Sequence, residues 1–330
     1  MARKPPKEVI EEHQIADRDL QSQRRLRQAE SDLKVEKAKL VASEKEVVEL
    51  RKRVEFFDKI STDKSPKEWK YPKRSRDGEA TAIIALSDWH IDQSVRPDRV
   101  SGLNEFTLDI ADERIKTVFA RSLLLLEDSR HLVSVPDIVI FLGGDFIHSM
   151  LHEENAADNT LHPFEACRWV SDRIESGLRQ IISCAGAKRL KIVTSMGNHG
   201  RNSRKMPASA IAETSYEYNM YLELRRRFAN EIDWQIGTGY FNYLNIYDFP
   251  IRFHHGDRIK FGGGINGIGV PAYRFIANAN TKRRAYADIY GHFHCFGWPG
   301  CFISNGSLVG IDEYSQAMSG DTEPKQAFVL

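Results

Sequence analysis

Apolar residues in the N-terminal part of the chain recur every seven residues. Between residues 8 and 60 the sequence contains neither glycine nor proline, and charged residues dominate. One position of the repeat is apolar throughout, at Leu26, Leu33, Leu40, Val47 and Val54. The position three residues further on is mixed, with Ala29, Glu36, Ser43, Leu50 and Phe57. This spacing is typical of a coiled-coil seam.

We therefore expect a helix over residues 1–60 that associates with other copies of itself, most simply as a homodimer. The alternative is a solvated single helix that folds back onto the rest of the chain. The segment 61–80 that follows is expected to be a linker. Its cations are interleaved with aromatic residues, which suits binding to a nucleic-acid backbone with stacked bases, although such a linker can also be merely solvated. The residues concerned are Lys64, Lys67, Lys70, Lys73, Arg74 and Arg76, with Trp69 and Tyr71 between them.

From residue 81 to residue 330, short apolar runs alternate with stretches of helical periodicity. Alternating strands and helices, followed by a half with many short strands, indicate an α/β domain. Helices are expected at 105–132, 163–185 and 208–230. Strands are expected at 81–87, 137–142, 190–195, 234–236, 241–246, 251–255, 287–290 and 301–304.

Composition and charge narrow the class of protein. The 330 residues are 41% hydrophobic and 28% charged, as in soluble globular proteins. The net charge is +1, so any nucleic-acid surface must be local. No apolar run approaches the roughly 18 residues that cross a bilayer, and the four cysteines show no paired spacing. We expect an intracellular, cytoplasmic protein with reduced thiols.

Metal-binding residue types follow five of the predicted strands. In an extended backbone, residues two apart point to the same side, so Asp88 and His90 could bind one ion. Oxygen and imidazole ligands without thiolate suit Mn²⁺, Fe or Zn²⁺. The five strand ends carry Asp88 and His90, then Gly144 and Asp145, then Asn198 and His199, then His255 and Gly256, and finally Gly291, His292 and His294.

In this order the motifs resemble the signature of the calcineurin-like metallophosphoesterases: D-x-H, G-D, G-N-H, H and G-H-x-H. The resemblance covers about residues 81–310 and implies a β-sandwich flanked by helices with two divalent ions. Mn²⁺ is the preferred ion, with Fe, Zn²⁺ and Mg²⁺ as alternatives. His255 is preferred to the adjacent His254 because it precedes the glycine turn. The resemblance assigns Asp88, His90 and His294 to one ion, Asn198, His255 and His292 to the other, and Asp145 to both.

Within that superfamily, residues 143–148 are similar to the G-G-D-L-F-H stretch of SbcD-type DNA repair nucleases. Residues 197–201 and 324–328 are similar to phage-encoded members, which would place the protein in the host cytoplasm. The resemblance implies that His199 faces the scissile phosphate as a catalytic residue, with His148 as a second. It also shows two departures. Gly200 stands where many members carry an acid, and the DNA-capping domain of those nucleases has no counterpart here.

Together these residues predict hydrolysis of a phosphodiester by hydroxide held between two ions, with His199 stabilising or protonating the leaving oxygen. The loop with Arg201, Arg204 and Lys205 could bind a neighbouring phosphate, or could simply be solvated. We expect a DNA nuclease, either an endonuclease or an exonuclease. The alternatives are a small-molecule phosphodiesterase or protein phosphatase on the same core, and a coiled-coil DNA-binding or assembly module with a vestigial site.

Overall fold

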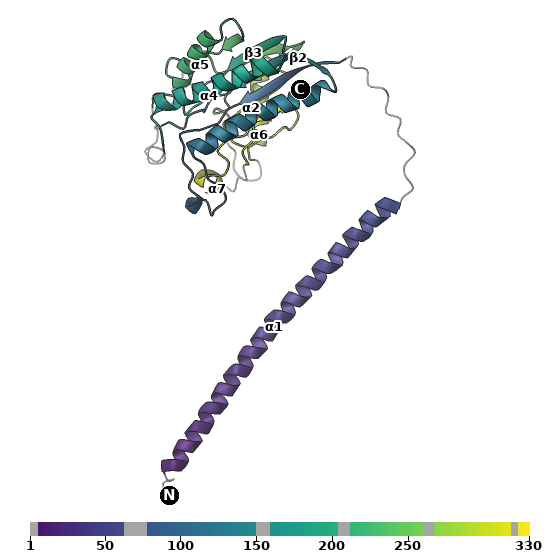
Figure 1. The fold of residues 1–330 in the computed structure, drawn as a ribbon, viewed down its shortest axis with the longest axis vertical. Helices are drawn as coiled ribbons and strands as arrows, with labels where there is room; N and C mark the ends of the chain where they lie inside the picture. The colour runs from purple at the N-terminus through teal and green to yellow at the C-terminus, as the bar shows by residue number, and fades with distance from the viewer. Residues whose placement is uncertain (1–5, 63–77, 150–158, 204–211, 261–266, 318–322) are drawn as a thin grey trace. The chain divides into compact units, whose positions relative to one another are not determined.

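The computed structural model describes residues 6–62, 78–149, 159–203, 212–260, 267–317 and 323–330. The chain divides into two structural units, Met1–Lys73 and Arg74–Leu330. The first unit contains one long helix, α1 (Pro6–Thr62), and the helix expected there is therefore present (Figure 1). Its pairing stays a prediction, and the cations of the predicted linker between Lys64 and Arg76 lie outside the described residues.

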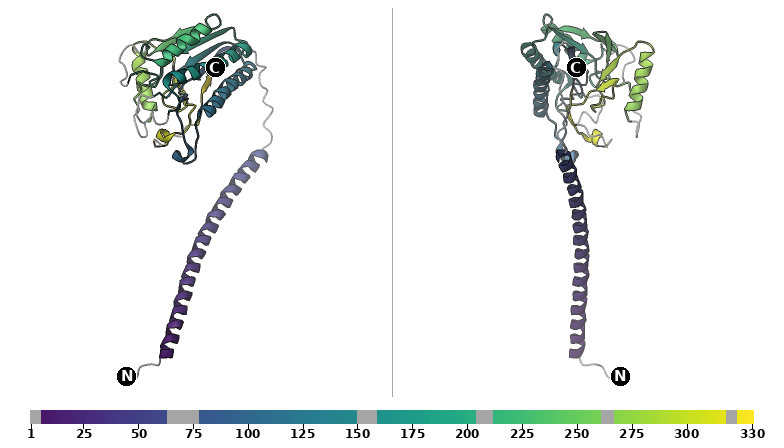
Figure 2. Two further views of the ribbon diagram at one scale, coloured as in Figure 1. Left: turned by 60° about the vertical axis from the view of Figure 1, so that its left-hand side comes forward. Right: turned by 90° about the vertical axis from the view of Figure 1, so that its right-hand side faces the viewer.

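The second unit is a sandwich of two β-sheets with helices on both outer faces (Figure 2). The five-stranded sheet has the order β4-β3-β2-β1-β9, and the four-stranded sheet has the order β5-β6-β7-β8. This is the β-sandwich flanked by helices that the sequence predicts, so the predicted fold class is confirmed. None of the described helices is long and apolar enough to span a membrane.

The first sheet contains β1 (Glu79–Leu86), β2 (Ser134–Leu142), β3 (Arg189–Thr194), β4 (Asp233–Ile236) and β9 (Ala327–Val329). The second contains β5 (Asn242–Ile246), β6 (Phe249–Phe253), β7 (Ala287–Tyr290) and β8 (Phe302–Ser304). The helices α2 (Leu108–Arg130), α4 (Pro163–Cys184) and α5 (Tyr216–Arg227) cover the first sheet. The helix α6 (Gly269–Asn280) packs on the second sheet, and η1 (Pro97–Arg99) and α7 (Glu313–Ala317) are short.

The alternation of side chains along β1 explains how its sheet is buried on both faces. Ile84 and Leu86 pack against the helices, whereas Ile83 and Ala85 pack between the sheets, where they join Phe253 of β6. Successive residues of a strand point to opposite faces, so a continuous apolar run satisfies both layers at once. The result is a central sheet held rigidly between α-helices and the second sheet.

Strand direction brings the predicted site residues to one end of the sandwich. The strands β1, β2, β3 and β4 run parallel to one another, as do β6, β7 and β8. The carboxyl ends of parallel strands lie at one edge of their sheet, which is where open α/β sheets place their ligands. The loops after β1, β2, β3, β6 and β7 carry all the predicted metal ligands.

Several boundaries differ from the sequence prediction for identifiable reasons. The strand β2 was expected to begin after Pro136 but begins at Ser134, because an irregularity in the pairing near Thr81 accommodates the proline. The helix expected over 208–230 begins at Tyr216, where the Ser215 side chain caps it. The strand expected at 251–255 ends at Phe253. The edge strand β9 was not predicted, since it is only three residues long.

Candidate metal centre

The candidate ligands lie in tight loops that start directly at the strand ends. Because β1 ends at Leu86, Asp88 and His90 are not in extended backbone and have φ of 56° and 41°. The sequence argument that they share one side of a strand is therefore wrong. Their ligand atoms nevertheless come within 4.8 Å of each other and of His294, since the left-handed residues fold the loop back on itself.

Three further candidate ligands also have left-handed backbone. The φ angles of Asp145, His292 and His294 are 53°, 71° and 56°. A non-glycine residue in this region costs on the order of 1 kcal/mol, and such strain gathers at functional sites where surrounding contacts enforce it. The folded chain thus holds these side chains in place at an energetic cost.

Asp88, His90 and His294 form the first group. His90 Nε2 lies 3.1 Å from His294 Nε2, and His294 Nε2 lies 3.8 Å from Asp88 Oδ1. The Asp88 carboxylate is held by Ser87 Oγ, which donates to Oδ2 over 2.5 Å, and by the His292 amide, which donates to Oδ1 over 2.8 Å. The Asp88 and His90 side chains are buried, whereas that of His294 is 25% exposed. The group is therefore preorganised and reaches solvent at His294.

Asp145, His255 and His292 form the second group, with ligand atoms within 4.8 Å of one another. His255 Nε2 lies 2.9 Å from Asp145 Oδ2 and 3.1 Å from Asn198 Oδ1. His255 Nδ1 lies 2.8 Å from the Gly143 carbonyl oxygen, to which it can donate. A histidine whose other nitrogen donates to a carbonyl is typical of a metal ligand, because the bond fixes both tautomer and ring orientation.

Asp145 lies between the two groups. Its Oδ2 is 2.9 Å from His255 Nε2 and 4.0 Å from His90 Nε2, and its Oδ1 accepts from the His199 amide over 2.7 Å. Gly197 allows this approach, because a Cβ there would collide with the Asp145 carboxylate. One carboxylate thus contacts residues from both groups, which is the position of a bridging ligand.

Electrostatics at this point favour bound cations. Burial raises the pKa of Asp88 to about 7, with a further increase from Asp145. Burial would raise the pKa of Asp145 as well, but His255 and His199 hold it well below its usual range. Buried carboxylates and imidazoles packed this closely are best satisfied by metal ions. The donors present are carboxylate oxygen, amide oxygen and imidazole nitrogen, so the residues fit divalent metal ions.

The structure separates His255 from its neighbour His254. His254 Nε2 lies 3.2 Å from Asp288 Oδ1, and its ring stacks on Tyr290 with centroids 5.1 Å apart. Asp288 also accepts two hydrogen bonds from Arg252, at 2.6 and 2.9 Å. His254 therefore belongs to a buried polar network beneath the site, and His255 faces Asp145 as preferred from the sequence.

The two predicted catalytic histidines lie beside His90. His148 Nδ1 is 3.3 Å from His90 Nδ1, and His199 Nδ1 can donate to the His148 carbonyl over 2.8 Å. The His148 and His199 rings stack with centroids 5.0 Å apart. Burial lowers the pKa of His148 to about 3, so its ring is neutral. Both rings thus border the first group of ligands.

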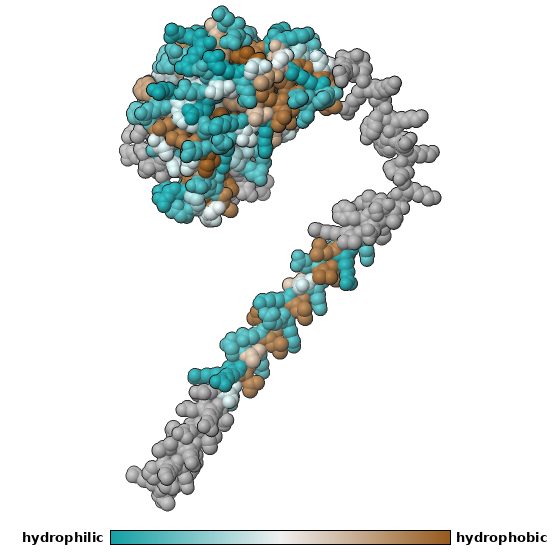
Figure 3. Space-filling view, in the orientation of Figure 1, coloured by the Kyte–Doolittle hydropathy of each residue, from teal (hydrophilic) through white to brown (hydrophobic). Residues whose placement is uncertain are grey.

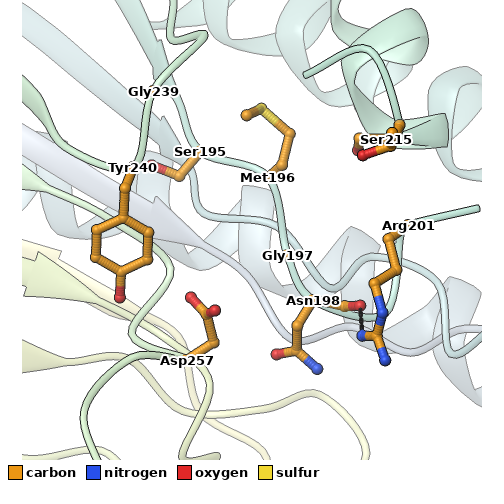
Figure 4. A pocket seen from close by; sticks show the side chains of 10 residues that line it. Ser195, Met196, Gly197, Asn198, Arg201, Ser215, Gly239, Tyr240 and Asp257 are labelled. Carbon is orange, nitrogen blue, oxygen red and sulfur yellow. Dashed lines mark hydrogen bonds between the residues drawn. The ribbon is translucent and has the colours of Figure 1, made fainter. Parts of the chain in front are cut away.

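The basic loop is described only in part. The Arg201 guanidinium donates to the carbonyl oxygens of Asn198 and Ser203, which fixes the loop that carries Asn198 (Figure 4). Arg204 and Lys205 lie outside the described residues. Binding of phosphate by these three cations stays a prediction.

Glu217 on α5 is a site residue that the sequence analysis missed. Its side chain is buried, and its two oxygens accept from the amides of Phe146 and Gly197 over 2.7 and 2.8 Å. These amides adjoin Asp145 and Asn198, so one carboxylate fixes both ligand loops. A Cβ at position 200 would lie 2.7 Å from Glu217 Cγ, and Gly200 therefore makes room for it. The sequence signal that could have indicated Glu217 was Gly200, which stands where many members of the resembled superfamily carry an acid.

Asp92 is a second residue that was missed. It is buried and accepts from the amides of His148 and Ser149 over 2.6 and 3.1 Å, which fixes the loop that carries His148. Its spacing of two residues from His90 was the available signal. Like Glu217, it acts on backbone amides and therefore leaves no pattern of paired side chains in the sequence.

The cavity beside the second group is small. Its volume is about 20 Å³, little more than a water molecule needs. Asp257, Tyr240 and the Asn198 amide approach one another across it (Figure 4). A larger cavity of about 570 Å³ lies between α2 and β9, and none of the candidate ligands lines it. Asn198 is the one candidate metal ligand that lines the smaller of these two cavities.

Comparisons with known proteins assign no family. No protein-family model matches the chain, and no curated protein matches it. Among solved structures, an archaeal phosphodiesterase is 13% identical, with 69% of this chain and 85% of that chain covered and a TM-score of 0.31. A single mutant of Vps29 from Entamoeba histolytica is 10% identical, with 76% and 85% covered and a TM-score of 0.33. A predicted phosphoesterase from Streptococcus pneumoniae is 13% identical, with 69% and 74% covered and a TM-score of 0.27.

Proposed function

We propose that the second structural unit hydrolyses phosphodiester bonds with two divalent metal ions, and that DNA is its substrate. The observation that carries the proposal is the pair of ligand groups that meet at Asp145. The first group supplies three donors near this carboxylate, and His255, His292 and the Asn198 amide supply three more. His148 and His199 lie beside the first group. A purely structural role would not require so many buried, strained and mutually close ligand side chains.

The donor set indicates how the ions would be held. Asp88, His90 and His294 would hold one ion, and Asn198, His255 and His292 the other, with Asp145 shared. Divalent ions, Mn²⁺ by preference, would polarise the phosphoryl oxygens and make water nucleophilic at neutral pH. The buried loops of the chain keep these donors fixed, which avoids the cost of reorganising them during the reaction.

The histidines beside the ligands would handle the proton. His199 Nδ1 can donate to the His148 carbonyl oxygen, which orients the ring so that the imidazolium form would donate its Nε2 proton to the leaving oxygen. His148 is neutral, since burial lowers its pKa, and so would offer the substrate a hydrogen bond rather than a charge. The stacked rings of His199 and His148 would therefore have different roles, one as proton donor and the other as neutral hydrogen-bond donor.

Two exposed aromatic rings that follow His294 in the chain support a nucleic-acid substrate. Phe296 and Trp298 follow His294 closely in the chain and are 52% and 67% exposed. Gly297 exchanges two backbone hydrogen bonds with Ser304, at 3.1 and 2.9 Å, which holds this loop on the end of β8. Exposed aromatic rings stack on unpaired bases, worth about 1–3 kcal/mol per base. We propose that the two rings bind bases that flank the scissile phosphate.

The proposal is tested with labelled single-stranded and duplex DNA beside a small chromogenic diester, each with Mn²⁺. We expect hydrolysis of the diester and of DNA, both abolished by a chelator. Trp298→Ala and Phe296→Ala should each slow DNA cleavage by about tenfold and leave diester hydrolysis unchanged. Phe164→Ala, which removes a 67% exposed ring on α4, is the matched control.

Each outcome separates the alternatives. Hydrolysis of the diester without cleavage of any DNA would support a small-molecule phosphodiesterase instead. Hydrolysis of neither by metal-loaded protein, together with release of phosphate from a phosphopeptide, would support a protein phosphatase. No hydrolysis of any of these substrates would overturn the enzymatic proposal and leave a vestigial site.

A further inference from the structure

The first structural unit exposes a surface that complements a second copy of itself. Every side chain described between residues 22 and 52 of α1 is exposed. The apolar series with seven-residue spacing is among them, with Leu26, Leu33, Leu40 and Val47 exposed by 62%, 55%, 60% and 44%. Brown patches recur along the described part of the helix in Figure 3. Large apolar residues repeated every seven positions gain free energy when a partner helix buries them.

Charges flank this series with alternating sign. When the apolar series is position a of a heptad, the flanking positions e and g carry one charged residue in each of four consecutive heptads. At position g the residues are Arg25, Asp32, Lys39 and Glu46. At position e they are Glu30, Lys37, Glu44 and Arg51. The sign alternates along both positions, so the pattern distinguishes one register from its neighbours.

A parallel, in-register pair of these helices would match every flanking charge with its opposite. In that arrangement, position g of one helix contacts position e of the other helix five residues further on. The four contacts are Arg25 with Glu30, Asp32 with Lys37, Lys39 with Glu44, and Glu46 with Arg51, each residue facing the second copy. A shift by one heptad would place like charges together at every contact.

We propose that α1 forms a parallel, in-register, two-stranded coiled coil with a second copy of this chain, in a register set by these charges. The β-branched Val47 at position a with Leu50 at position d favours two strands. Glu36 and Ser43 at position d weaken the seam, and the Glu36 carboxylate is 2.8 Å from Lys39 Nζ of its own helix. Because the apolar contacts along this seam are weak, the flanking charges determine which helix pairs with α1 and in which register.

The test reverses the charges at position e in the full chain. Two residues become basic and two acidic, so net charge is unchanged in the variant Glu30→Lys/Lys37→Glu/Glu44→Lys/Arg51→Glu. Sedimentation equilibrium should show a dimer for the unaltered chain and a dissociation constant raised by about 100-fold or more in the variant, because attractive pairs become repulsive. A monomeric unaltered chain, or a variant that dimerises equally well, would overturn the proposal.

A complementary variant shows whether the first variant fails to dimerise because of its charges or because α1 has unfolded. The variant Arg25→Glu/Asp32→Lys/Lys39→Glu/Glu46→Lys reverses position g alone and should also fail to dimerise. Mixed with the first variant, it should form a heterodimer, since every contact then pairs opposite charges. Absence of the heterodimer in native mass spectrometry would contradict the charge-set register.

Orientation is tested with single cysteines. Ala29→Cys lies at position d and should give a rapid disulfide between two copies when the helices are parallel and in register. Ala38→Cys lies at position f, away from the seam, and is the matched control for the native thiols. Cross-linking no faster at residue 29 than at residue 38 would indicate an antiparallel or shifted pair. Glu36→Leu should tighten the dimer, because it removes the one charged residue from the described seam.

Discussion

At the scale of single residues, the geometry of the candidate metal centre depends on polar side chains that have hydrogen-bonding neighbours. Asp145, His255 and Asp88 each have at least one neighbour within hydrogen-bonding distance. The candidate metal ligands could be predicted from the sequence because Asp, Asn and His at successive strand ends form a visible pattern. Glu217 and Asp92 could not, because each fixes backbone amides, which every residue has. The first two predictions therefore concern His199, which lies beside the candidate ligands, and Glu217, which fixes their loops.

His199 should act on the proton and not on the metal. We expect His199→Ala to keep its metal content and lose about 10²-fold in kcat on the small diester, as for loss of a general acid. The His131→Ala variant, which removes an exposed histidine after α2, should behave like the unaltered enzyme. If metal content falls in step with rate, His199 is a ligand and the assignment is wrong.

Glu217 should act by positioning the ligand loops, in partnership with Gly200. Glu217→Ala leaves two buried amides without their acceptor and should lower both metal affinity and stability, the latter by about 2 kcal/mol. Gly200→Ala should have a similar effect, because its Cβ would displace the carboxylate. In the Glu217→Ala background the second change should cost little. Additive effects in this double-mutant cycle would show that the two positions act independently.

At the scale of elements, strands and helices were predicted well and the loops were not. The apolar run of β1 alternates between two buried layers, and this periodicity is legible in the sequence. The left-handed turn at Asp88 and His90 is not, because it depends on contacts with loops distant in sequence, such as the hydrogen bond between the Asp88 amide and the Gly144 carbonyl. The same holds for β9, whose pairing with β1 defines it.

The second sheet depends on a buried ion pair beneath the site. Arg252 and Asp288 are both buried, so Asp288→Ala would leave a guanidinium without its partner. We expect a loss of about 3 kcal/mol in the free energy of unfolding, measured with denaturant on the metal-free protein. Asp98→Ala removes an exposed pair with Arg96 and should cost less than about 1 kcal/mol. Equal losses in the two variants would show that burial does not determine the strength of the pair.

At the scale of the whole molecule, we propose that the second structural unit carries out hydrolysis and that the first serves assembly and DNA binding. The candidate metal ligands all lie in the second unit, whereas the seam of α1 and the residues of the predicted linker up to Lys73 lie in the first. The sequence predicts this division through a change of periodicity near residue 80.

Removal of residues 1–77 tests this division. We expect the shortened chain to hydrolyse the small diester at an unchanged rate and to bind DNA more weakly. The dependence of DNA binding on salt should also flatten, since each lost phosphate contact removes about one unit of slope. Unchanged affinity and slope would restrict the first unit to assembly. Loss of diester hydrolysis would show that the second unit needs the first.

Metal content is the direct test of whether the Asp145 carboxylate organises two metal ions. The unaltered chain, dialysed against Mn²⁺ and then against metal-free buffer, should retain about two ions per chain by elemental analysis. Asp145→Asn should retain less than one and lose nearly all turnover, because Asp145 lies between both groups of ligands. Two ions per chain in Asp145→Asn, with hydrolysis intact, would contradict the shared carboxylate and the dinuclear centre built around it.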